Sequence, residues 1–226
     1  MRFSSGFDVL DELLSGGYNS SEINMIYGPA ASGKTTACFL AVLVIAKKGK
    51  KVLFVDTEKG FSVERIKQLV GKGYEKIIEN IFVLNIDSFD EQKKKFLKLF
   101  SIVAEGDFDL VIVDTLGAHY RRALKENVYG VNKEMDDEFN ILRDIAKKSR
   151  SGVLVTNQVY DSFKEKNKVE IVGGNMFRNW CGVLLELKKF SDNKRGISLI
   201  KSVKKEIKKD EKEIIFKIEE RGFTPL

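Results

Sequence analysis

Short hydrophobic runs alternate with longer amphipathic stretches along most of the chain, which is typical of βαβ units. Strands are predicted where the runs are apolar and rich in β-branched residues, at 23–27, 51–56, 81–86, 110–114 and 152–157. Helices are predicted where the period changes, over 7–14, 34–48, 62–72, 88–106 and 131–149. Ser88 and Glu91 match a capping box at the start of the fourth helix. This order predicts a mostly parallel, twisted sheet flanked by helices.

The pattern changes from Gly182 onward, because the long amphipathic segments stop. Three strand-like runs follow, over 182–190, 196–206 and 213–220. The polar turns between them contain Asp192-Asn193 and Lys209-Asp210. Closely spaced strands of this kind predict an antiparallel extension at one edge of the sheet. The expected fold class is therefore α/β, with one domain over residues 1–226.

Composition and charge narrow the class of protein. The chain has 226 residues, of which 43% are hydrophobic and 32% charged, so it is expected to be globular rather than disordered. Its longest apolar stretch, at 37–46, is too short for the about 18 residues of a membrane span, and a cytoplasmic protein without a membrane partner is expected. Cys38 and Cys181 are expected to be free thiols. The net charge of +6 fits a nucleic-acid partner or a lysine-rich surface equally well.

The stretch "GPAASGKT", at 28–35, matches the phosphate-loop pattern and lies between a predicted strand and a predicted helix. Its glycines let the backbone amides turn inward toward anionic oxygens, next to the positive end of the helix. Lys34 supplies a cation to the β- and γ-phosphates, Thr35 a hydroxyl to Mg²⁺, and Thr36 reaches the α-phosphate. The chain is therefore expected to bind ATP and Mg²⁺ through Gly28, Pro29, Ala30, Ala31, Ser32, Gly33, Lys34, Thr35 and Thr36.

Carboxylates end two of the predicted strands. Asp114 closes "LVIVD", as expected of a Walker-B aspartate that holds Mg²⁺ together with Thr35. Asp56 and Glu58 end the strand that follows the phosphate-loop helix, on the side of the sheet where ligands bind. Glu58 is placed either to polarise a water for attack on the γ-phosphate or to lie exposed and pair with Lys59.

The segments "MIYGPAASGKT", "VLFVDTEKGFSVERI", "LVIVDTLGAHYR", "VLVTNQVY" and "VGGN" follow in an order that resembles the RecA/RadA recombinase family. The resemblance implies a RecA-like P-loop ATPase core, in which Glu58 activates the hydrolytic water and Gln158 senses the γ-phosphate beside Lys34. It also implies that Arg65 packs on the adenine face. The first arginine of that family stretch is replaced by Ser62.

Two polar spans, 118–131 and 160–175, fall where this family has its DNA-contacting loops. Both mix cations with aromatic rings, which is how single strands are held without sequence specificity. The expected DNA-binding residues are Tyr120, Arg121, Arg122, Lys164, Lys166 and Lys168. Solvated loops with incidental lysines remain the alternative. Trp180 and Phe177 are expected in the core.

The chain departs from full-length recombinases of this family. We expect it to lack their N-terminal helix-hairpin-helix domain and their Phe-x-x-Ala linker, and the Gly-Arg-Gly stretch of the first loop does not occur in the sequence. We therefore expect an accessory protein with weak ATP hydrolysis that binds single-stranded DNA and assists a RadA-type recombinase and other recombination proteins, as a monomer or a homo-oligomer. The alternatives are a filament-forming, DNA-dependent ATPase that exchanges strands, a KaiC-like signalling ATPase, and a protein that uses ATP as a structural switch.

Overall fold

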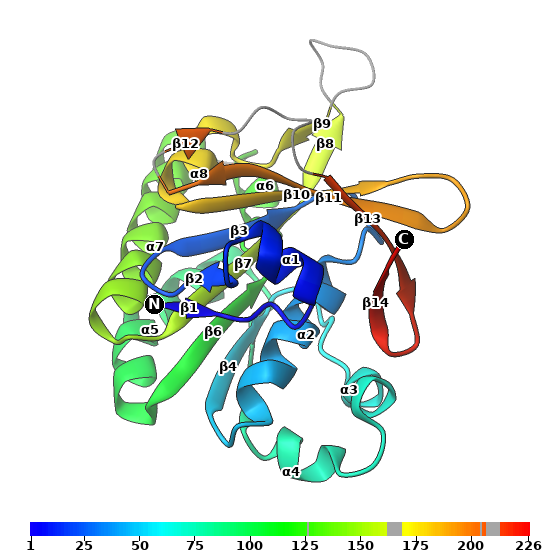
Figure 1. The fold of residues 1–226 in the computed structure, drawn as a ribbon. Coiled ribbons are helices and arrows are strands. Elements are labelled where there is room, and N and C mark those ends of the chain that lie inside the picture. Colours follow the sequence, from blue (N-terminus) through cyan, green and yellow to red (C-terminus); the bar gives the residue numbers. More distant parts are fainter. Residues whose placement is uncertain (126, 162–168, 204, 207–212) are drawn as a thin grey trace.

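A large twisted sheet runs through the middle of the molecule, with helices on both of its faces (Figure 1). The computed structural model describes residues 1–125, 127–161, 169–203, 205–206 and 213–226. Over these residues the sheet has ten strands in the order β14-β13-β11-β10-β3-β7-β6-β4-β5, and β12 pairs with β11. The fold class predicted from the sequence is confirmed.

Six neighbouring strands are parallel and form the half of the sheet that carries the phosphate loop. They are β10 (Val183–Lys189), β3 (Ile23–Tyr27), β7 (Gly152–Asn157), β6 (Phe108–Asp114), β4 (Lys51–Asp56) and β5 (Ile81–Asn85). The interior strands β3, β6 and β7 are almost continuously buried, because helices cover both of their faces. Because the strands are parallel, their carboxyl ends lie at the same edge of the sheet. The candidate site is located at that edge.

Helices cover both faces of the sheet. One face packs against α2 (Lys34–Ala46), with α1 (Asp8–Leu13), α3 (Val63–Val70) and α4 (Tyr74–Ile78) around it. The other packs against α5 (Phe89–Gly106) and α7 (Val128–Lys148), together with α6 (Tyr120–Ala123) and α8 (Gly174–Trp180). Each face has its own apolar core, and α2 is buried along most of its length.

The antiparallel extension consists of β11 (Lys194–Ser202), β13 (Glu213–Glu219) and β14 (Gly222–Pro225), with β12 (Lys205–Glu206) beside β11. Asp192 and Asn193 join β10 to β11 with φ values of 56° and 58°. Two consecutive residues with positive φ are the signature of a tight hairpin turn, as the sequence predicted. The second predicted turn, Lys209-Asp210, lies outside the described residues.

Several short elements have no counterpart in the sequence pattern. They are the pair β1 (Arg2–Phe3) and β2 (Tyr18–Asn19), the pair β8 (Val159–Asp161) and β9 (Val169–Ile171), and the helices α4, α6 and α8. Elements of two to seven residues span too little of a period for hydrophobic patterning to reveal them. The predicted helix over 62–72 corresponds to α3, which ends before Gly71, a residue with a positive φ, and α4 begins only after Gly73.

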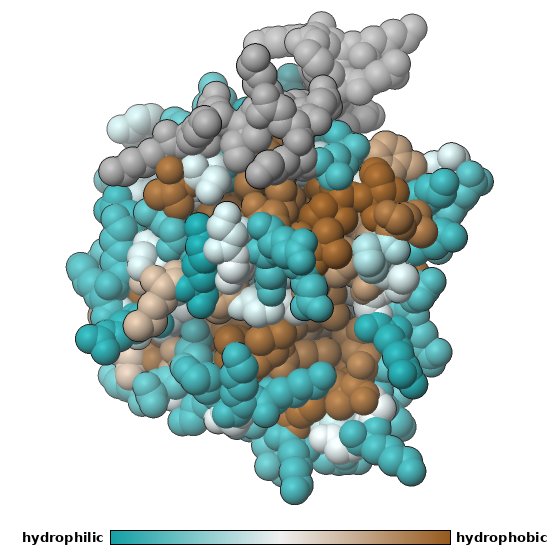
Figure 2. All heavy atoms as spheres, in the orientation of Figure 1, coloured by the Kyte–Doolittle hydropathy of each residue, from teal (hydrophilic) through white to brown (hydrophobic). Residues whose placement is uncertain are grey.

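The surface follows the usual division of hydrophobic and hydrophilic residues. In the view of Figure 2, hydrophobic side chains are seen mainly toward the middle of the face, interspersed with hydrophilic ones, and hydrophilic side chains form most of its margin. Cys38 and Cys181 are both buried and free, as predicted. Among the described residues, no helix combines the length and apolar composition required to cross a membrane.

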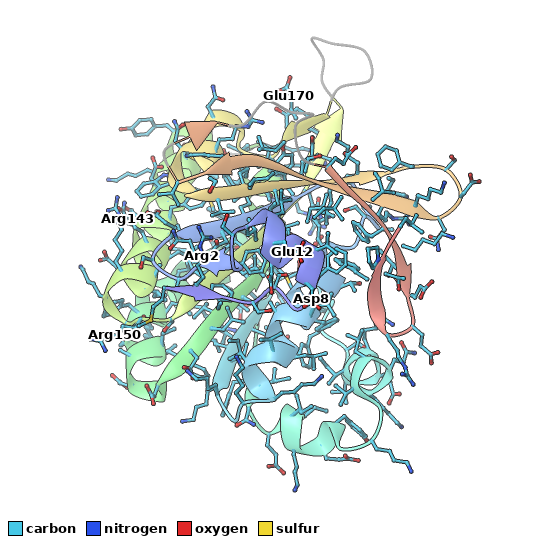
Figure 3. All side chains as sticks on the ribbon, viewed as in Figure 1. Arg2, Asp8, Glu12, Arg143, Arg150 and Glu170 are labelled. Carbon is cyan, nitrogen blue, oxygen red and sulfur yellow. The ribbon has the colours of Figure 1, made fainter. Side chains whose placement is uncertain are left out.

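Phe177 lies in the core and Trp180 lies at its edge, and both pack against Phe139 of α7. Phe177 is fully buried and packs edge-on against Phe139. The Trp180 ring stacks parallel to Phe139, and its Nε1 donates to Asp136 Oδ1 at 2.7 Å. Arg143, which is labelled on α7 in Figure 3, covers the ring at 4.9 Å from its centroid. These contacts confirm the structural role predicted for both residues.

Candidate nucleotide site

The phosphate loop joins β3 to α2 and is built from small residues on an irregular backbone. Gly33 precedes the helix with a φ of 106°, a conformation that favours glycine, and Ala31 also has a positive φ of 57°. Lys34 opens the helix and is only 8% exposed. Its Nζ donates to the carbonyl oxygens of Gly28 and Pro29, each at 2.9 Å. The lysine predicted to bind phosphate is therefore held within the loop itself.

Burial lowers the pKa of Lys34, while the carboxylates of Asp114 and Glu58 act in the opposite direction. Both carboxylates are thus close enough for their charges to act on the lysine. A bound triphosphate would add several negative charges at the same place and favour the charged ammonium. This electrostatic arrangement suits an anionic ligand.

The predicted magnesium ligands are in direct contact. Thr35 Oγ1 donates to Asp114 Oδ2 at 2.7 Å, and Thr156 on β7 donates to the other carboxylate oxygen, Oδ1. Burial raises the pKa of Asp114, although these two hydrogen bonds oppose the shift. Within the described ranges, no group of three or more His, Cys, Asp or Glu side chains is arranged so that it could hold a metal ion. Mg²⁺ needs no such cluster, because it takes one or two protein oxygens together with phosphate oxygens and waters, and Thr35 and Asp114 supply such oxygens.

Asp56 and Glu58, the two acids that end β4, have different roles. Asp56 is 2% exposed and accepts hydrogen bonds from the amides of Glu58 (3.2 Å), Gly60 (3.1 Å) and Phe61 (2.9 Å). It therefore shapes the loop after β4, in the manner of an Asx turn. Glu58 is exposed, and this loop aims its side chain toward the carboxyl ends of β6 and β7.

Glu58 joins residues from three strand ends. Its Oε1 accepts a hydrogen bond from Gln158 Nε2 beyond β7, and its Oε2 accepts one from Thr115 Oγ1 beyond β6 at 3.1 Å. The ends of β4 and β6 are also tied by Thr57, whose hydroxyl donates to Thr115 O at 2.7 Å and accepts from Thr115 N at 2.8 Å. The ion pair of Lys59 is with Asp87 and not with Glu58. The structure thus brings together Glu58 and Gln158, which the family resemblance had associated with one function.

An open cleft of about 660 Å³ adjoins this contact. Its lining includes both acceptor and donor of this contact and four basic side chains, namely Glu58, Gln158, Lys59, Arg121, Arg122 and Lys125. Both arginines are exposed. The first predicted DNA loop therefore faces the same space as the two residues predicted to act at the γ-phosphate.

The remaining predicted DNA-binding residues differ in position. Tyr120 is 4% exposed; its hydroxyl donates to Asn132 Oδ1 at 2.6 Å and its ring packs on Phe177 at 5.3 Å. In this conformation its ring is a core contact, so a base could reach it only if α6 moved. His119, the neighbouring residue, is also buried, against Ile86 O. Lys164, Lys166 and Lys168 lie outside the described residues.

Arg65, which the resemblance places on the adenine, is bound to the C-terminal hairpin. Its Nη1 donates to Glu220 O and its Nη2 to Glu219 O, each at 3.0 Å, and its Nη1 also donates to Gln68 Oε1. Ser62, at the position of the missing family arginine, caps α3 by accepting from Arg65 N. The guanidinium plane is therefore fixed at the turn between β13 and β14, and adenine stacking stays a prediction.

Sequence reasoning did not find three contributors to the site. Thr156 could have been suspected from its place in "VLVTNQ", one residue before a strand end that faces the Walker-B strand. The structural role of Asp56 follows from its burial, which no local pattern reveals. The contact of Arg195 with the loop, from its Nε to Ala31 O at 3.3 Å, joins residues far apart in the sequence and has no local signal.

A parallel sheet, a phosphate loop at a helix start and an aspartate at the end of a neighbouring strand define a P-loop protein of the RecA-like class. Comparison with known families narrows this class. Residues 1–225 match the Rad51 family, so the chain belongs to that family. The resemblance to RecA/RadA recombinases identified from the motifs is thereby confirmed.

Individual relatives agree with this family. The protein is 35% identical over 218 residues to the DNA repair and recombination protein RadB of Methanobrevibacter smithii, which covers 94% of this chain and 92% of the relative. It is 30% identical to the RadB of Methanocaldococcus jannaschii, over 95% and 98% of the two chains. A crystal structure of the RadB recombinase superposes with a TM-score of 0.82 at 34% identity, covering 98% of both chains.

Proposed function

We propose that this protein is an ATP-binding accessory protein of DNA repair and homologous recombination in the cytoplasm, which binds single-stranded DNA and assists a RadA-type recombinase. The observation that carries the proposal is the contact between Glu58 and Gln158 at the edge of a cleft lined by Arg121 and Arg122. The residues that respond to a γ-phosphate and those that would hold a DNA phosphate thus face one space.

ATP and Mg²⁺ binding rests on the phosphate loop. Lys34 would exchange the carbonyl oxygens of Gly28 and Pro29 for the β- and γ-phosphates, while Thr35 and Asp114 would hold the Mg²⁺ shell. When bound, Mg²⁺ would neutralise negative charge on the phosphate oxygens. Glu58 would then hold the attacking water by accepting its proton.

The hydrogen bonds of Glu58 support the proposal that ATP hydrolysis is slow. Both of its carboxylate oxygens already accept a hydrogen bond, one from Gln158 and one from Thr115. These two hydrogen bonds occupy acceptor sites on Glu58 that an attacking water would otherwise use. Hydrolysis would then require Gln158 to move, which a ligand in the adjoining cleft would favour.

A sheet edge to which no other strand of the described residues is paired supports the proposal of a protein partner. β5 is the last strand in the sheet order, and two of its apolar residues, Phe82 and Val83, are 44% and 38% exposed. Leu97 on the neighbouring helix α5 is 70% exposed. An extended segment of a partner can add to such an edge and bury these side chains.

Measurement of ATP hydrolysis with and without single-stranded DNA, together with the size of the protein in the presence of ATP, tests the proposal. An accessory protein binds ATP and single-stranded DNA, turns over slowly and forms no long assemblies. Strong stimulation by DNA with large assemblies would instead identify an active filament-forming recombinase. Indifference to DNA would point to a signalling ATPase.

A further inference from the structure

The antiparallel C-terminal extension contacts the phosphate loop at two points. From β11, Arg195 Nε donates to Ala31 O at 3.3 Å. From the β13–β14 hairpin, Ile218 and Phe223 lie against Gly33, where a Cβ atom would come within 2.9 Å of Ile218 Cδ1 and 3.3 Å of the Phe223 ring. Figure 1 shows this hairpin beside the start of α2. The loop is thus contacted by two different strands of the extension.

The loop needs such outside support because its own side chains are small. Ala30, Ala31 and Ser32 offer little surface to pack, and the backbone at Ala31 has the positive φ that side-chain-bearing residues adopt at a cost. Within the loop, Lys34 holds the carbonyls of Gly28 and Pro29. A bound triphosphate would draw Lys34 away. Among the described residues, Arg195 would then be the side chain that donates a hydrogen bond to the apex of the loop.

Arg195 is well placed for this role. It is half-buried, and its position on β11 is fixed by pairing with Phe216 of β13 on one side and Lys189 of β10 on the other. Its Nη1 donates to Lys194 O at 2.9 Å, which orients the guanidinium. The same extension is joined to the opposite end of the nucleotide site by Arg65, which donates to Glu219 and Glu220.

We propose that Arg195 is a positioning residue of the nucleotide site, which holds the apex of the phosphate loop in its binding shape through the Ala31 carbonyl. This inference rests on the proposed ATP binding. It assigns to the C-terminal extension a part in shaping the phosphate loop. Arg195 acts through the loop and not on the reacting atoms. Its loss weakens nucleotide binding without unfolding the protein.

The test is the affinity for a fluorescent ATP analogue in the wild type and in three variants. Arg195→Ala removes the contact, and Arg195→Lys keeps a cationic donor at the same place. Lys189→Ala is the matched control, because it removes an equal charge from an exposed, directly paired position on β10. Melting temperatures without nucleotide are measured for all four proteins.

We expect Arg195→Ala to bind roughly tenfold more weakly, the effect of losing one hydrogen bond from a charged group. Arg195→Lys should recover most of the affinity, Lys189→Ala should match the wild type, and the nucleotide-free melting temperatures should agree. Unchanged binding by Arg195→Ala, an equal loss in Lys189→Ala, or a lowered melting temperature without recovery by lysine would each overturn the proposal. Failure of the wild type to bind ATP would refute the proposed function itself, and would be visible before any variant is compared.

Discussion

The side-chain amide of Gln158 donates a hydrogen bond to the carboxylate of Glu58, although β6 lies between the strands that carry them. The two residues are 100 positions apart in the sequence. Thr115, which directly follows β6, donates to the second carboxylate oxygen of Glu58 at 3.1 Å. The middle strand end is thereby included in the same set of hydrogen bonds. Side-chain hydrogen bonds therefore link the ends of three neighbouring strands, β4, β6 and β7.

Replacing Glu58 with glutamine should stall hydrolysis and leave ATP binding intact. The amide keeps the size of the side chain but cannot accept the proton of the attacking water, so we expect turnover to fall by about a hundredfold or more. Single-turnover hydrolysis and ATP affinity are to be measured side by side. Glu64→Gln on α3 is the control, because it removes an exposed acid outside the cleft. Normal hydrolysis by Glu58→Gln would remove Glu58 from the mechanism.

Replacing Lys34 with alanine should abolish nucleotide binding. The variant loses the only side-chain cation within the loop itself, and it leaves the carbonyls of Gly28 and Pro29 without their donor. Titration with a fluorescent ATP analogue measures the loss. Lys47→Ala, at the other end of the same helix and exposed, serves as the control. Retained affinity in Lys34→Ala would place the nucleotide elsewhere.

The sequence revealed the strands, the main helices and the phosphate loop because each rests on a local pattern of at least one period. "INMIY" was predicted at the bounds that β3 has, and the Thr35–Asp114 contact followed from chain order. Roles set by tertiary packing could not be found this way. Tyr120 was expected at the surface of a polar loop, but α6 folds inward and buries it on Phe177. Local polarity does not report which side of a short helix meets the core.

Replacing Arg121 and Arg122 together with alanine should weaken binding of single-stranded DNA and flatten its dependence on salt. Each lost phosphate contact on a single strand lowers the slope of log affinity against log salt by about 0.7, so the double variant should lose roughly 1.4. Binding is to be titrated from low to high salt. The control is Arg143→Ala with Arg150→Ala, which removes the same charge from two exposed positions on and just beyond α7 (Figure 3) that do not line the cleft. An unchanged slope would exclude the first loop as the phosphate contact.

Glu138 predicts a pH dependence of stability that is separate from the nucleotide site. It is 2% exposed, and burial raises the pKa of its carboxyl to about 8, an effect that Glu134 reinforces and the hydrogen bond from Gln92 opposes. Gln92 Nε2 donates to Glu138 Oε2 at 2.7 Å and to Leu116 O at 3.3 Å. Gln92 Oε1 and Glu138 Oε1 lack partners within the described part of the chain.

If Glu138 carried a proton on Oε1, the neutral acid could donate a hydrogen bond to Gln92 Oε1. Both oxygens would then have a partner. The folded protein therefore keeps this proton between the ordinary pKa of a glutamate and about 8, whereas the unfolded chain releases it. The free energy of unfolding should fall as the pH rises through this window, by a few kcal/mol at most.

Urea unfolding at about pH 5.5 and pH 8.5 measures the effect. Glu138→Gln cannot titrate, but its amide can donate to Gln92 Oε1 as the protonated acid does. This variant should therefore lose the part of the pH dependence that the wild type owes to Glu138 and gain stability relative to it at the higher pH. Glu105→Gln, an exposed position on α5, should keep the wild-type dependence. If Glu138→Gln and the wild type changed in parallel with pH, the carboxyl would already be charged in the folded protein, and the neutral pair with Gln92 would not exist.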